Sequence, residues 1–172
     1  MIEIYSDGSC KKNPGGPGGW GFVAIQKSPS APDIIAKHDY ELCNETTNNR
    51  EELKAMIKSL EYVKYLRENK ENFTREKVVV YSDSRYVVEI CNNWGYRWRR
   101  NGWSRPNNQP VENLDLVKKI FSYLDIPDLA IEIKKVPGHN GIVGNELADK
   151  LATGQYDAFL KIASDNNLYF KK

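Results

Sequence analysis

The stretch Val78-Val79-Val80-Tyr81-Ser82-Asp83-Ser84 decides the fold more than any other part of the chain. Its continuous apolar run is typical of a central strand that is buried on both faces. Ser84 can then cap a helix that runs from Arg85 to about Cys91. A strand of this kind, leading directly into a helix, predicts an α/β sheet that is covered by helices.

Upstream of this stretch, the sequence predicts three strands, over residues 2–7, 20–26 and 34–42. Ile2 and Ile4 share one face of the first strand. Residues 8–19 are rich in Gly and Pro and predict turns, and residues 27–33 predict a loop. Because the connections are short, the three strands are expected to form an antiparallel meander.

The clearest helix lies between the meander and the central strand. Its apolar residues recur with the 3.6-residue period of a helix: Leu53, Met56, Ile57, Leu60, Val63 and Leu66. Its outward positions are charged: Lys54, Lys58, Glu61 and Lys64. The polar residues 67–76 that follow predict a loop.

Residues 92–112 differ from the rest of the chain, since they combine tryptophans, arginines and turn formers and contain no acid before Glu112. Beyond them the pattern predicts a helix over 115–124, a strand over 129–136, a turn over 137–141, and helices over 144–153 and 156–163. The last residues are expected to be loosely attached. The predicted fold is a mixed five-stranded sheet with helices on both faces. Residues 1–153 are expected to form the catalytic domain and residues 154–172 a C-terminal extension, partly helical or loosely ordered.

The composition of the 172 residues bounds the function. A net charge of +2 excludes a globally basic protein, so any nucleic-acid surface must be local. The three cysteines, Cys10, Cys43 and Cys91, have no CxxC spacing, which argues against disulfides and zinc and favours a reducing compartment. No signal peptide or membrane span is visible. We therefore expect a soluble, cytoplasmic protein that does not associate with membranes.

Four acids, Asp7, Glu52, Asp83 and Asp149, stand in comparable settings at four distant places. Three of them have a plain interpretation on their own: a turn for Asp7, a place in the first turn of the long helix, favoured by the helix dipole, for Glu52, and a solvated helix position for Asp149. If the strands that end at Asp7 and Asp83 are neighbours, their carboxylates emerge at one sheet edge. Clustered carboxylates repel one another, and the usual partner of such a cluster is a hard divalent cation.

Longer motifs surround these acids. They are Ser-Asp-Gly-Ser-Cys at 6–10, Asn-Pro-Gly at 13–15, Thr-Thr-Asn-Asn-Arg at 46–50 with Glu52-Leu53, Ser-Asp-Ser at 82–84 with Tyr86-Val87, Gly102-Trp103, Pro110-Val111 with Asn113, Gly138-His139, and Asn145-Glu146 with Asp149. In these motifs and in their order, the chain resembles a type 1 ribonuclease H over roughly residues 1–153. The resemblance implies the ribonuclease H-like fold.

The resemblance also implies an activity. It is endonucleolytic hydrolysis of the RNA strand of an RNA–DNA hybrid, leaving 5′-phosphate and 3′-hydroxyl ends. Two Mg²⁺ ions, for which Mn²⁺ substitutes, are implied at Asp7, Glu52, Asp83 and Asp149, with Asp7 shared between them. His139 matches a loop histidine that assists proton transfer or product departure, although a histidine in such a turn can also be a plain surface residue. A monomer without an obligate protein partner is expected.

Substrate contacts are expected on two sides of this site. The residues expected to meet the RNA strand, whose 2′-hydroxyl distinguishes it from DNA, are Gly8, Ser9, Cys10, Asn13, Asn48, Asn49 and Arg85. Those expected to meet the DNA strand are Thr47, Trp94, Arg97, Trp98, Arg99, Arg100, Arg105 and Asn113. Some of these residues also have a purely structural interpretation. Asn48 and Asn49 can cap a helix. At least one of Trp94, Trp98 and Trp103, above all Trp103, is expected to pack in the core.

The sequence departs from the family pattern at two positions, and three other functions are compatible with parts of it. Arg85 stands where the family often has glutamine, and Glu45 where some members carry a basic residue. A noncatalytic binding module would lack one of the acids. A 3′–5′ exonuclease of related fold would lack the Thr-Thr-Asn-Asn-Arg motif and the Trp/Arg segment. A nuclease domain from a reverse transcriptase remains open.

Overall fold

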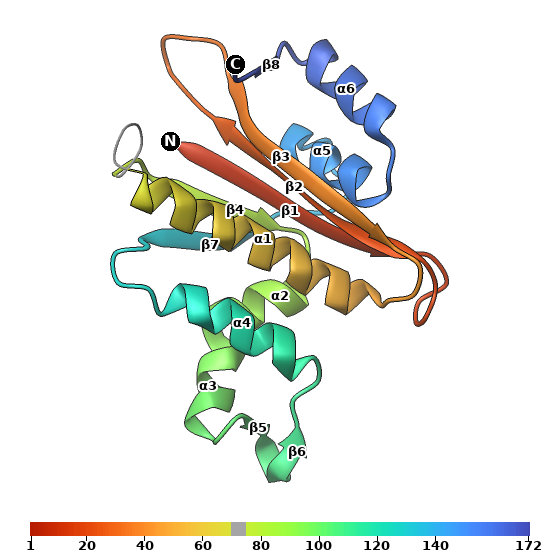
Figure 1. Ribbon diagram of the computed structural model, residues 1–172, viewed down its shortest axis with the longest axis vertical. Coiled ribbons are helices and arrows are strands. Elements are labelled where there is room, and N and C mark those ends of the chain that lie inside the picture. The colour runs from red at the N-terminus through yellow and green to blue at the C-terminus, as the bar shows by residue number, and fades with distance from the viewer. Residues whose placement is uncertain (70–74) are drawn as a thin grey trace.

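The computed structural model describes residues 1–69 and 75–172, and within them six strands form one mixed sheet in the order β7-β4-β1-β2-β3-β8 (Figure 1). These strands are β1 (Ile2–Cys10), β2 (Gly18–Gln26), β3 (Ile34–Cys43), β4 (Val78–Ser82), β7 (Ile131–Lys135) and β8 (Tyr169–Phe170). The strands β1, β2 and β3 pair antiparallel, whereas β4 is parallel to both β1 and β7. The predicted α/β fold is therefore confirmed, with one short strand more than expected.

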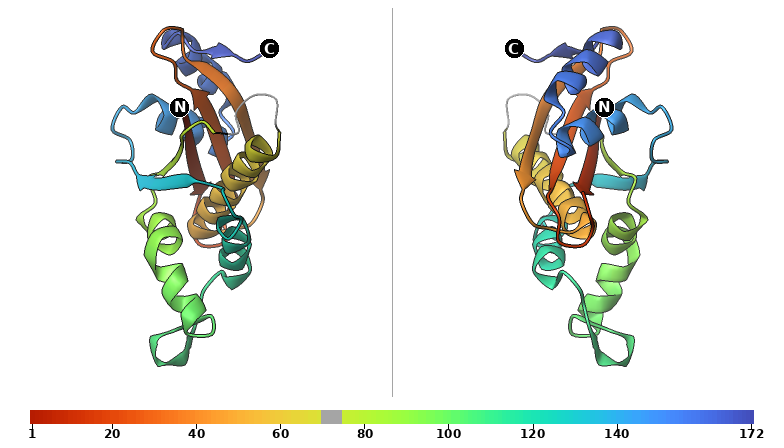
Figure 2. Two further views of the ribbon diagram at one scale, coloured as in Figure 1. Left: turned by 90° about the vertical axis from the view of Figure 1, so that its left-hand side faces the viewer. Right: turned by 90° about the vertical axis from the view of Figure 1, so that its right-hand side faces the viewer.

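Helices cover both faces of the sheet (Figures 1 and 2). They are α1 (Asn48–Glu68), α2 (Arg85–Glu89), α3 (Gly95–Arg100), α4 (Leu114–Leu124), α5 (Val143–Ala152) and α6 (Tyr156–Asp165). Apolar residues of α1, α2 and α4 pack with Ile2, Ile4 and Phe22 on one face. Residues of α5 and α6 pack with Tyr5, Val23 and Ile35 on the other face. Successive side chains of β1 and β2 point to opposite faces of the sheet, so these strands contribute to two separate hydrophobic layers.

The central strand and the long helix form as the sequence predicts. Val78, Val79 and Val80 are all buried, because β4 lies between β1 and β7 with helices on both sides. All six residues of the predicted apolar stripe of α1 are buried as well. The helix starts earlier than expected, since Thr47 caps it by accepting a hydrogen bond from the Arg50 N–H at 3.2 Å.

Element boundaries differ from the prediction at several places. The strands β1 and β2 extend to Cys10 and back to Gly18, so the predicted turn over 8–19 shrinks to residues 11–17. At the other end, α1 continues to Glu68, within the predicted loop over 67–76; residues 70–74 of that loop lie outside the described residues. The helix and strand expected over 115–124 and 129–136 are α4 and β7, with ends shifted by up to two residues.

The segment after β4 is more helical than the sequence suggests. Ser84 caps α2 as predicted, accepting a hydrogen bond from the Val87 N–H at 3.2 Å. A π-helical turn over Ile90–Trp94 then joins α2 to α3 without a break. The chain returns through a short antiparallel ribbon, β5 (Ser104–Arg105) and β6 (Gln109–Pro110), before α4 begins. We call residues 92–110 the protrusion, because they extend away from the sheet (Figure 1).

The expectation that the last residues are loosely attached is wrong. Helix α6 forms over Tyr156–Asp165 and buries Phe159 completely. Beyond it, β8 pairs with the start of β3: the Tyr169 N–H donates to Asp33 O at 3.3 Å and the Lys171 N–H donates to Ile35 O at 3.0 Å. The C-terminal segment therefore completes one edge of the sheet.

Candidate active site

The parallel pairing of β1 with β4 places two of the acids side by side. Ser6 and Ser82 are partners in register, and Asp7 and Asp83 directly follow them. The condition stated from the sequence, that these two strands are neighbours, is therefore met, and their ends lie at one sheet edge.

The third acid comes from α1, which crosses closely over the end of β1. A Cβ added to Gly8 would collide with the backbone of Glu51 and Glu52, so only glycine permits this approach. As a result, one carboxylate oxygen from each of Asp7, Glu52 and Asp83 lies within 4.8 Å of the other two. The sequence suggested that Glu52 lies in the first turn of α1, but the helix begins at Asn48 and Glu52 lies in its second turn.

Burial and mutual repulsion dominate the electrostatics of this acid cluster. Asp7 is only 5% exposed, and burial together with the charges of Asp83 and Asp149 raises its pKa to about 8. The Gly8 N–H donates a hydrogen bond to Asp7 Oδ1 at 2.9 Å, which lowers the pKa but offsets only part of the increase. Burial and the charges of Asp7 and Asp83 likewise raise the pKa of Glu52 well above its usual value.

The donor set fits a divalent cation. Glu52 Oε2 is buried and accepts no hydrogen bond from the described residues. An unpaired buried carboxylate oxygen costs free energy, and a bound cation would remove that cost. Hard cations such as Mg²⁺ and Ca²⁺ prefer carboxylate oxygens, and the cluster offers them from three residues.

The fourth acid, Asp149, lies near this cluster but outside the group of three. A Cβ added to Gly21, the partner of Asp7 on β2, would lie 2.6 Å from Leu151 Cβ and 3.0 Å from Ala148 O. The backbone of α5 therefore lies directly on β2 beside Asp7. Asp149 is partly exposed, with Lys150 Nζ at 3.8 Å from its Oδ2, and its charge raises the pKa of Asp7.

Asn145 is a site residue to which the sequence analysis assigned no role. It is 4% exposed, and its Nδ2 donates a hydrogen bond to Asp83 Oδ2 at 3.4 Å. The loop that carries His139 also passes this acid, since a Cβ added to Gly138 would lie 3.2 Å from Asp83 Oδ2. His139 itself is exposed, with a φ of 49°. Only the motif around Asn145 could have drawn attention to it.

Most residues expected to meet the RNA strand gather in two adjoining segments, whereas Arg85 lies apart from them at the start of α2. Gly8, Ser9 and Cys10 form the end of β1, and the Ser9 hydroxyl donates to Ala152 O at 3.0 Å. Asn48 and Asn49 open α1 without capping it, because Thr47 is the cap. The exposed residues of the set are Asn13, Asn48, Asn49 and Arg85. The turn over 11–17 and the start of α1 are linked by a hydrogen bond from the Asn48 N–H to Asn13 Oδ1 at 3.1 Å.

The arginines expected to meet the DNA strand divide into two kinds. Arg99 is already occupied, because its Nη1 lies 2.7 Å from Asp125 Oδ2 and its guanidinium lies over Phe121. Arg105 Nε donates to Pro110 O at 2.8 Å within the ribbon. In contrast, Arg97 and Arg100 are exposed, and no ion pair joins either to another described residue. These two are the protrusion's available cations.

The other members of this set have structural partners too. Trp94, Trp98 and Trp103 are all partly buried against the core, so the packing role expected for at least one of them, Trp103 above all, applies to all three. Asn113 accepts from Arg50 Nη1 at 3.3 Å and donates to Tyr86 Oη at 3.2 Å. Thr47 is the cap of α1 described above.

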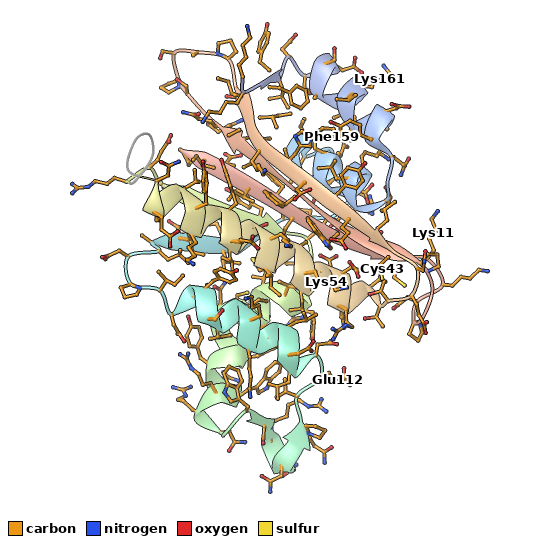
Figure 3. The ribbon with its side chains drawn as sticks, viewed as in Figure 1. Lys11, Cys43, Lys54, Glu112, Phe159 and Lys161 are labelled. Atoms are coloured by element: carbon orange, nitrogen blue, oxygen red, sulfur yellow. The ribbon has the colours of Figure 1, made fainter. Side chains whose placement is uncertain are left out.

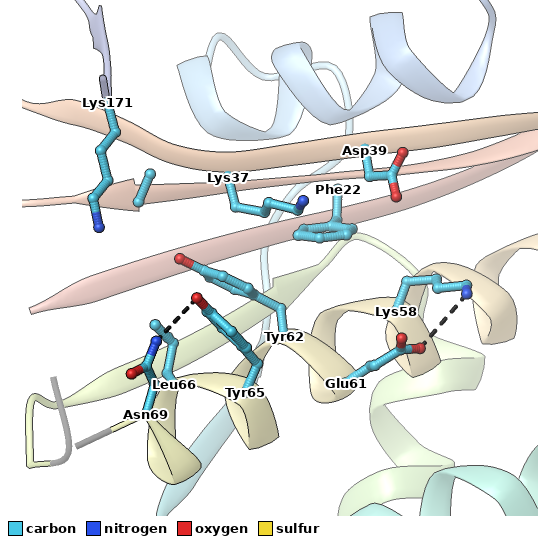
Figure 4. Close-up of a pocket in the computed structure, with 11 residues that line it drawn as sticks. Phe22, Lys37, Asp39, Lys58, Glu61, Tyr62, Tyr65, Leu66, Asn69 and Lys171 are labelled. Carbon is cyan, nitrogen blue, oxygen red and sulfur yellow. Dashed lines mark hydrogen bonds and ion pairs between the residues drawn. The ribbon is translucent and has the colours of Figure 1, made fainter. Parts of the chain in front are cut away.

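Two grooves lie away from the acid cluster. One, of about 450 Å³, runs along the protrusion, where Trp94, Arg97 and Trp98 line it. The other, of about 460 Å³, lies between β3 and the second half of α1, where Tyr62 and Tyr65 reach toward the strands (Figure 4). None of the four acids lines the second groove, so this groove is separate from the candidate active site.

No helix within residues 1–69 and 75–172 is long and apolar enough to span a membrane.

Comparisons with known proteins agree with this geometry. The sequence profile of the RNase H family matches residues 1–156. The ribonuclease H of Polynucleobacter asymbioticus is 40% identical over 159 residues, 92% of each chain. That of Orientia tsutsugamushi is 38% identical over 165 residues, 96% of this chain and 88% of the relative. Among solved structures, LC9-RNase H1, a type 1 RNase H with the type 2 active-site motif, superposes with a TM-score of 0.76 at 24% identity, covering 99% of this chain and 86% of that one. The chain therefore belongs to the ribonuclease H family and is a nuclease.

Proposed function

We propose that this protein is an endoribonuclease that hydrolyses the RNA strand of RNA–DNA hybrids. The observation that carries the proposal is the convergence of Asp7, Glu52 and Asp83 at the end of the β1–β4 pair. Family membership supports the choice of substrate. We further propose that residues 1–153 are the catalytic domain and 154–172 an extension of it. The free thiols support a cytoplasmic location.

We propose that Asp7, Glu52, Asp83 and Asp149 hold two Mg²⁺ ions, for which Mn²⁺ substitutes. When bound, such ions supply an activated water and neutralise charge on the phosphate, giving 5′-phosphate and 3′-hydroxyl ends. The chain's own residues orient the reaction: Asn145 holds Asp83, and the Gly8 N–H holds Asp7. The exposed His139 lies in the loop beside Asp83, where it can transfer a proton or help the product leave.

Recognition of the hybrid is divided between two surfaces in this proposal. The amides and asparagine side chains of β1, the turn over 11–17 and the start of α1 contact 2′-hydroxyls of the RNA strand. Arg97 and Arg100 contact phosphates of the DNA strand, with the partly buried tryptophans beside them. The protein acts as a monomer and needs no protein partner.

A substrate panel tests this function. Labelled RNA–DNA hybrid, double-stranded RNA, single-stranded RNA and double-stranded DNA are incubated with the protein in Mg²⁺. We expect internal cleavage of the RNA strand of the hybrid alone, with 5′-phosphate ends. Equal cleavage of double-stranded RNA or DNA, or products that shorten only from one end, would contradict the proposed activity.

The two available arginines of the protrusion lead to a prediction about salt. Replacing Arg97 and Arg100 with Ala should raise KM severalfold and leave kcat at saturating hybrid within about twofold. Each lost phosphate contact lowers the slope of log K against log salt by up to about 0.9, so the slope should fall by up to about 2. Arg99→Ala is the matched control on the same helix: it should lower Tm, because it breaks the Asp125 pair, but leave the slope unchanged. An unchanged slope in the double variant would place the DNA strand elsewhere.

His139 leads to a second prediction. His139→Ala should lower kcat about 100-fold, because positioned proton transfer typically contributes about 100–10,000-fold and bound cations would supply most of the electrostatic stabilisation. KM should change little, and the loss should be far smaller than the loss on removing an acid of the cluster. Asn140→Ala, in the same exposed loop, is the control for loop disturbance. Full activity of His139→Ala would make this histidine a surface residue without a part in the reaction.

A further inference from the structure

Glu51, the neighbour of Glu52 in the sequence, is a buried acid that the proposed mechanism does not use. Its side chain is 0% exposed. Its Oε1 accepts hydrogen bonds from the Thr46 hydroxyl at 2.7 Å and from Lys54 Nζ at 2.9 Å. Its Oε2 is buried and has no hydrogen-bond partner among the described residues. Because a buried carboxylate with a vacant oxygen is costly, an apolar side chain of similar volume would serve stability at least as well.

The partner of Glu51, Thr46, connects the turn over 11–17 to the start of α1. The Thr46 N–H donates to Gly16 O at 3.0 Å, and the Gly15 N–H donates to Thr46 O at 2.8 Å. Cys10 Sγ also lies 3.4 Å from Thr46 O. Every polar group of Thr46 is therefore engaged, with Glu51 holding the hydroxyl.

These contacts sit between the two segments that we assign to the RNA strand. The turn over 11–17 carries Asn13, and the first turn of α1 carries Asn48 and Asn49. Among the described residues, one further hydrogen bond joins the segments, from the Asn48 N–H to Asn13 Oδ1, and both of these residues are exposed. Figure 3 places Lys54, the second partner of Glu51, on the half of α1 that faces Lys11 and Cys43. The anchor of both segments is thus the buried pair of Thr46 and Glu51.

We propose that Glu51 is a positioning residue for RNA-strand recognition, acting through Thr46, an inference that rests on the proposed function. The Glu51–Thr46 hydrogen bond fixes the spacing between Asn13 and Asn48, and hydrogen bonds to consecutive 2′-hydroxyls require a fixed spacing. Without Glu51 Oε1, the buried Thr46 hydroxyl would lack its hydrogen-bond acceptor, and the turn over 11–17 would be held less firmly. Glu51 does not touch the reacting atoms, so its effect falls on binding rather than on the chemical step.

The test compares two substitutions of Glu51. Glu51→Met keeps the volume and helix propensity but removes the acceptor; it should raise KM for the hybrid about 5–10-fold and leave kcat within twofold. Glu51→Gln keeps an acceptor for Thr46 and should restore KM to within twofold of wild type. Glu61→Met is the matched control, because it removes an exposed acid of the same helix; it should match wild type.

A double-mutant cycle shows whether Thr46 carries the effect. Thr46→Val should raise KM as Glu51→Met does, and the two together should raise it no further, since they break the same bond. Amide hydrogen exchange at Gly15 should also accelerate in Glu51→Met, and this readout needs no activity. The affinity for double-stranded DNA should stay unchanged in all variants.

Two failures are distinguishable. If the wild-type protein does not cleave hybrids, the proposed function fails, whatever these variants do. If the wild-type protein cleaves them and Glu51→Met keeps the wild-type KM, or Glu51→Gln is as impaired as Glu51→Met, the positioning role is overturned. A fall in kcat without a change in KM would also overturn it, because that result would place Glu51 in the chemical step.

Discussion

Asp7→Asn should reduce hydrolysis of the hybrid at least about a thousandfold while leaving the affinity for hybrid within about threefold. Losses of this size are typical when a central catalytic group is removed. Asp7 is the most buried acid of the cluster and the one on which the charges of Asp83 and Asp149 both act. Asn has nearly the same shape but offers one neutral oxygen, so it cannot offset the charge of a divalent cation.

Single-turnover rates and binding by fluorescence anisotropy provide the measurement. Asp165→Asn, an exposed acid paired with Lys161 on α6, is the matched control and should behave as wild type. Retention of more than a tenth of the wild-type rate in Asp7→Asn would remove Asp7 from the centre of the reaction. A parallel loss of binding would show that the variant fails to hold the hybrid, which the separate location of the protrusion does not predict.

Without a divalent cation, the same substitution should raise thermal stability. The pKa of Asp7 is about 8 in the folded protein against a reference value of 3.8, so folding favours its protonated form. A raised carboxyl pKa gives stability that is complete below about pH 4 and is lost as the pH rises through 8. At pH 7, which lies between these two values, folding of the wild type takes up a proton at Asp7, and this lowers its stability by up to about 4 kcal/mol relative to acidic pH. Asn avoids this cost.

Melting curves in chelator at pH 7 should show Asp7→Asn about 5 °C above wild type, after allowance for its lost hydrogen bond. The gap should shrink as the pH falls and close below about pH 4, where Asp7 becomes protonated in both the folded and unfolded states. Excess Mg²⁺ should narrow the gap at pH 7, because the cation binds the folded wild type better than the variant. A variant less stable than wild type in chelator at pH 7 would mean that the acids do not repel one another as the geometry requires.

The parts of the fold that the sequence predicts well are those with a local pattern. The continuous apolar run at Val78–Val80 predicts a buried strand, and the 3.6-residue period of the α1 stripe predicts a helix. Both elements formed as expected. Strand β8 has no such pattern: it is two residues long, and Tyr169 is 59% exposed. It forms because Phe170 packs edge-on against Phe159, at 6.1 Å between ring centroids, and because distant β3 offers backbone partners.

The candidate site divides in the same way. Asp7, Glu52 and Asp83 could be found from their motifs, because strand ends and a helix start bring them together. The sequence could not predict that Arg99 is ion-paired while Arg97 is available, because the partner of Arg99 is Asp125, 26 residues further along the chain. The burial of Glu51 could not be predicted from the sequence either. An acid in the first turn of a helix normally interacts with the helix dipole in solvent, whereas Glu51 is fully buried and accepts a hydrogen bond from the Thr46 hydroxyl.

The rate of RNA-strand cleavage in a labelled hybrid, measured as Mg²⁺ is varied, is the decisive test of the proposed hydrolytic centre. The clustered carboxylates repel one another, and within the described residues no Lys or Arg forms an ion pair with Asp7, Glu52 or Asp83, so a divalent cation should be essential for cleavage. We expect no cleavage in chelator, internal cleavage of the RNA strand that rises with Mg²⁺, and the same products with Mn²⁺. Cleavage at an equal rate in chelator would contradict the assignment of these three acids to the hydrolytic centre.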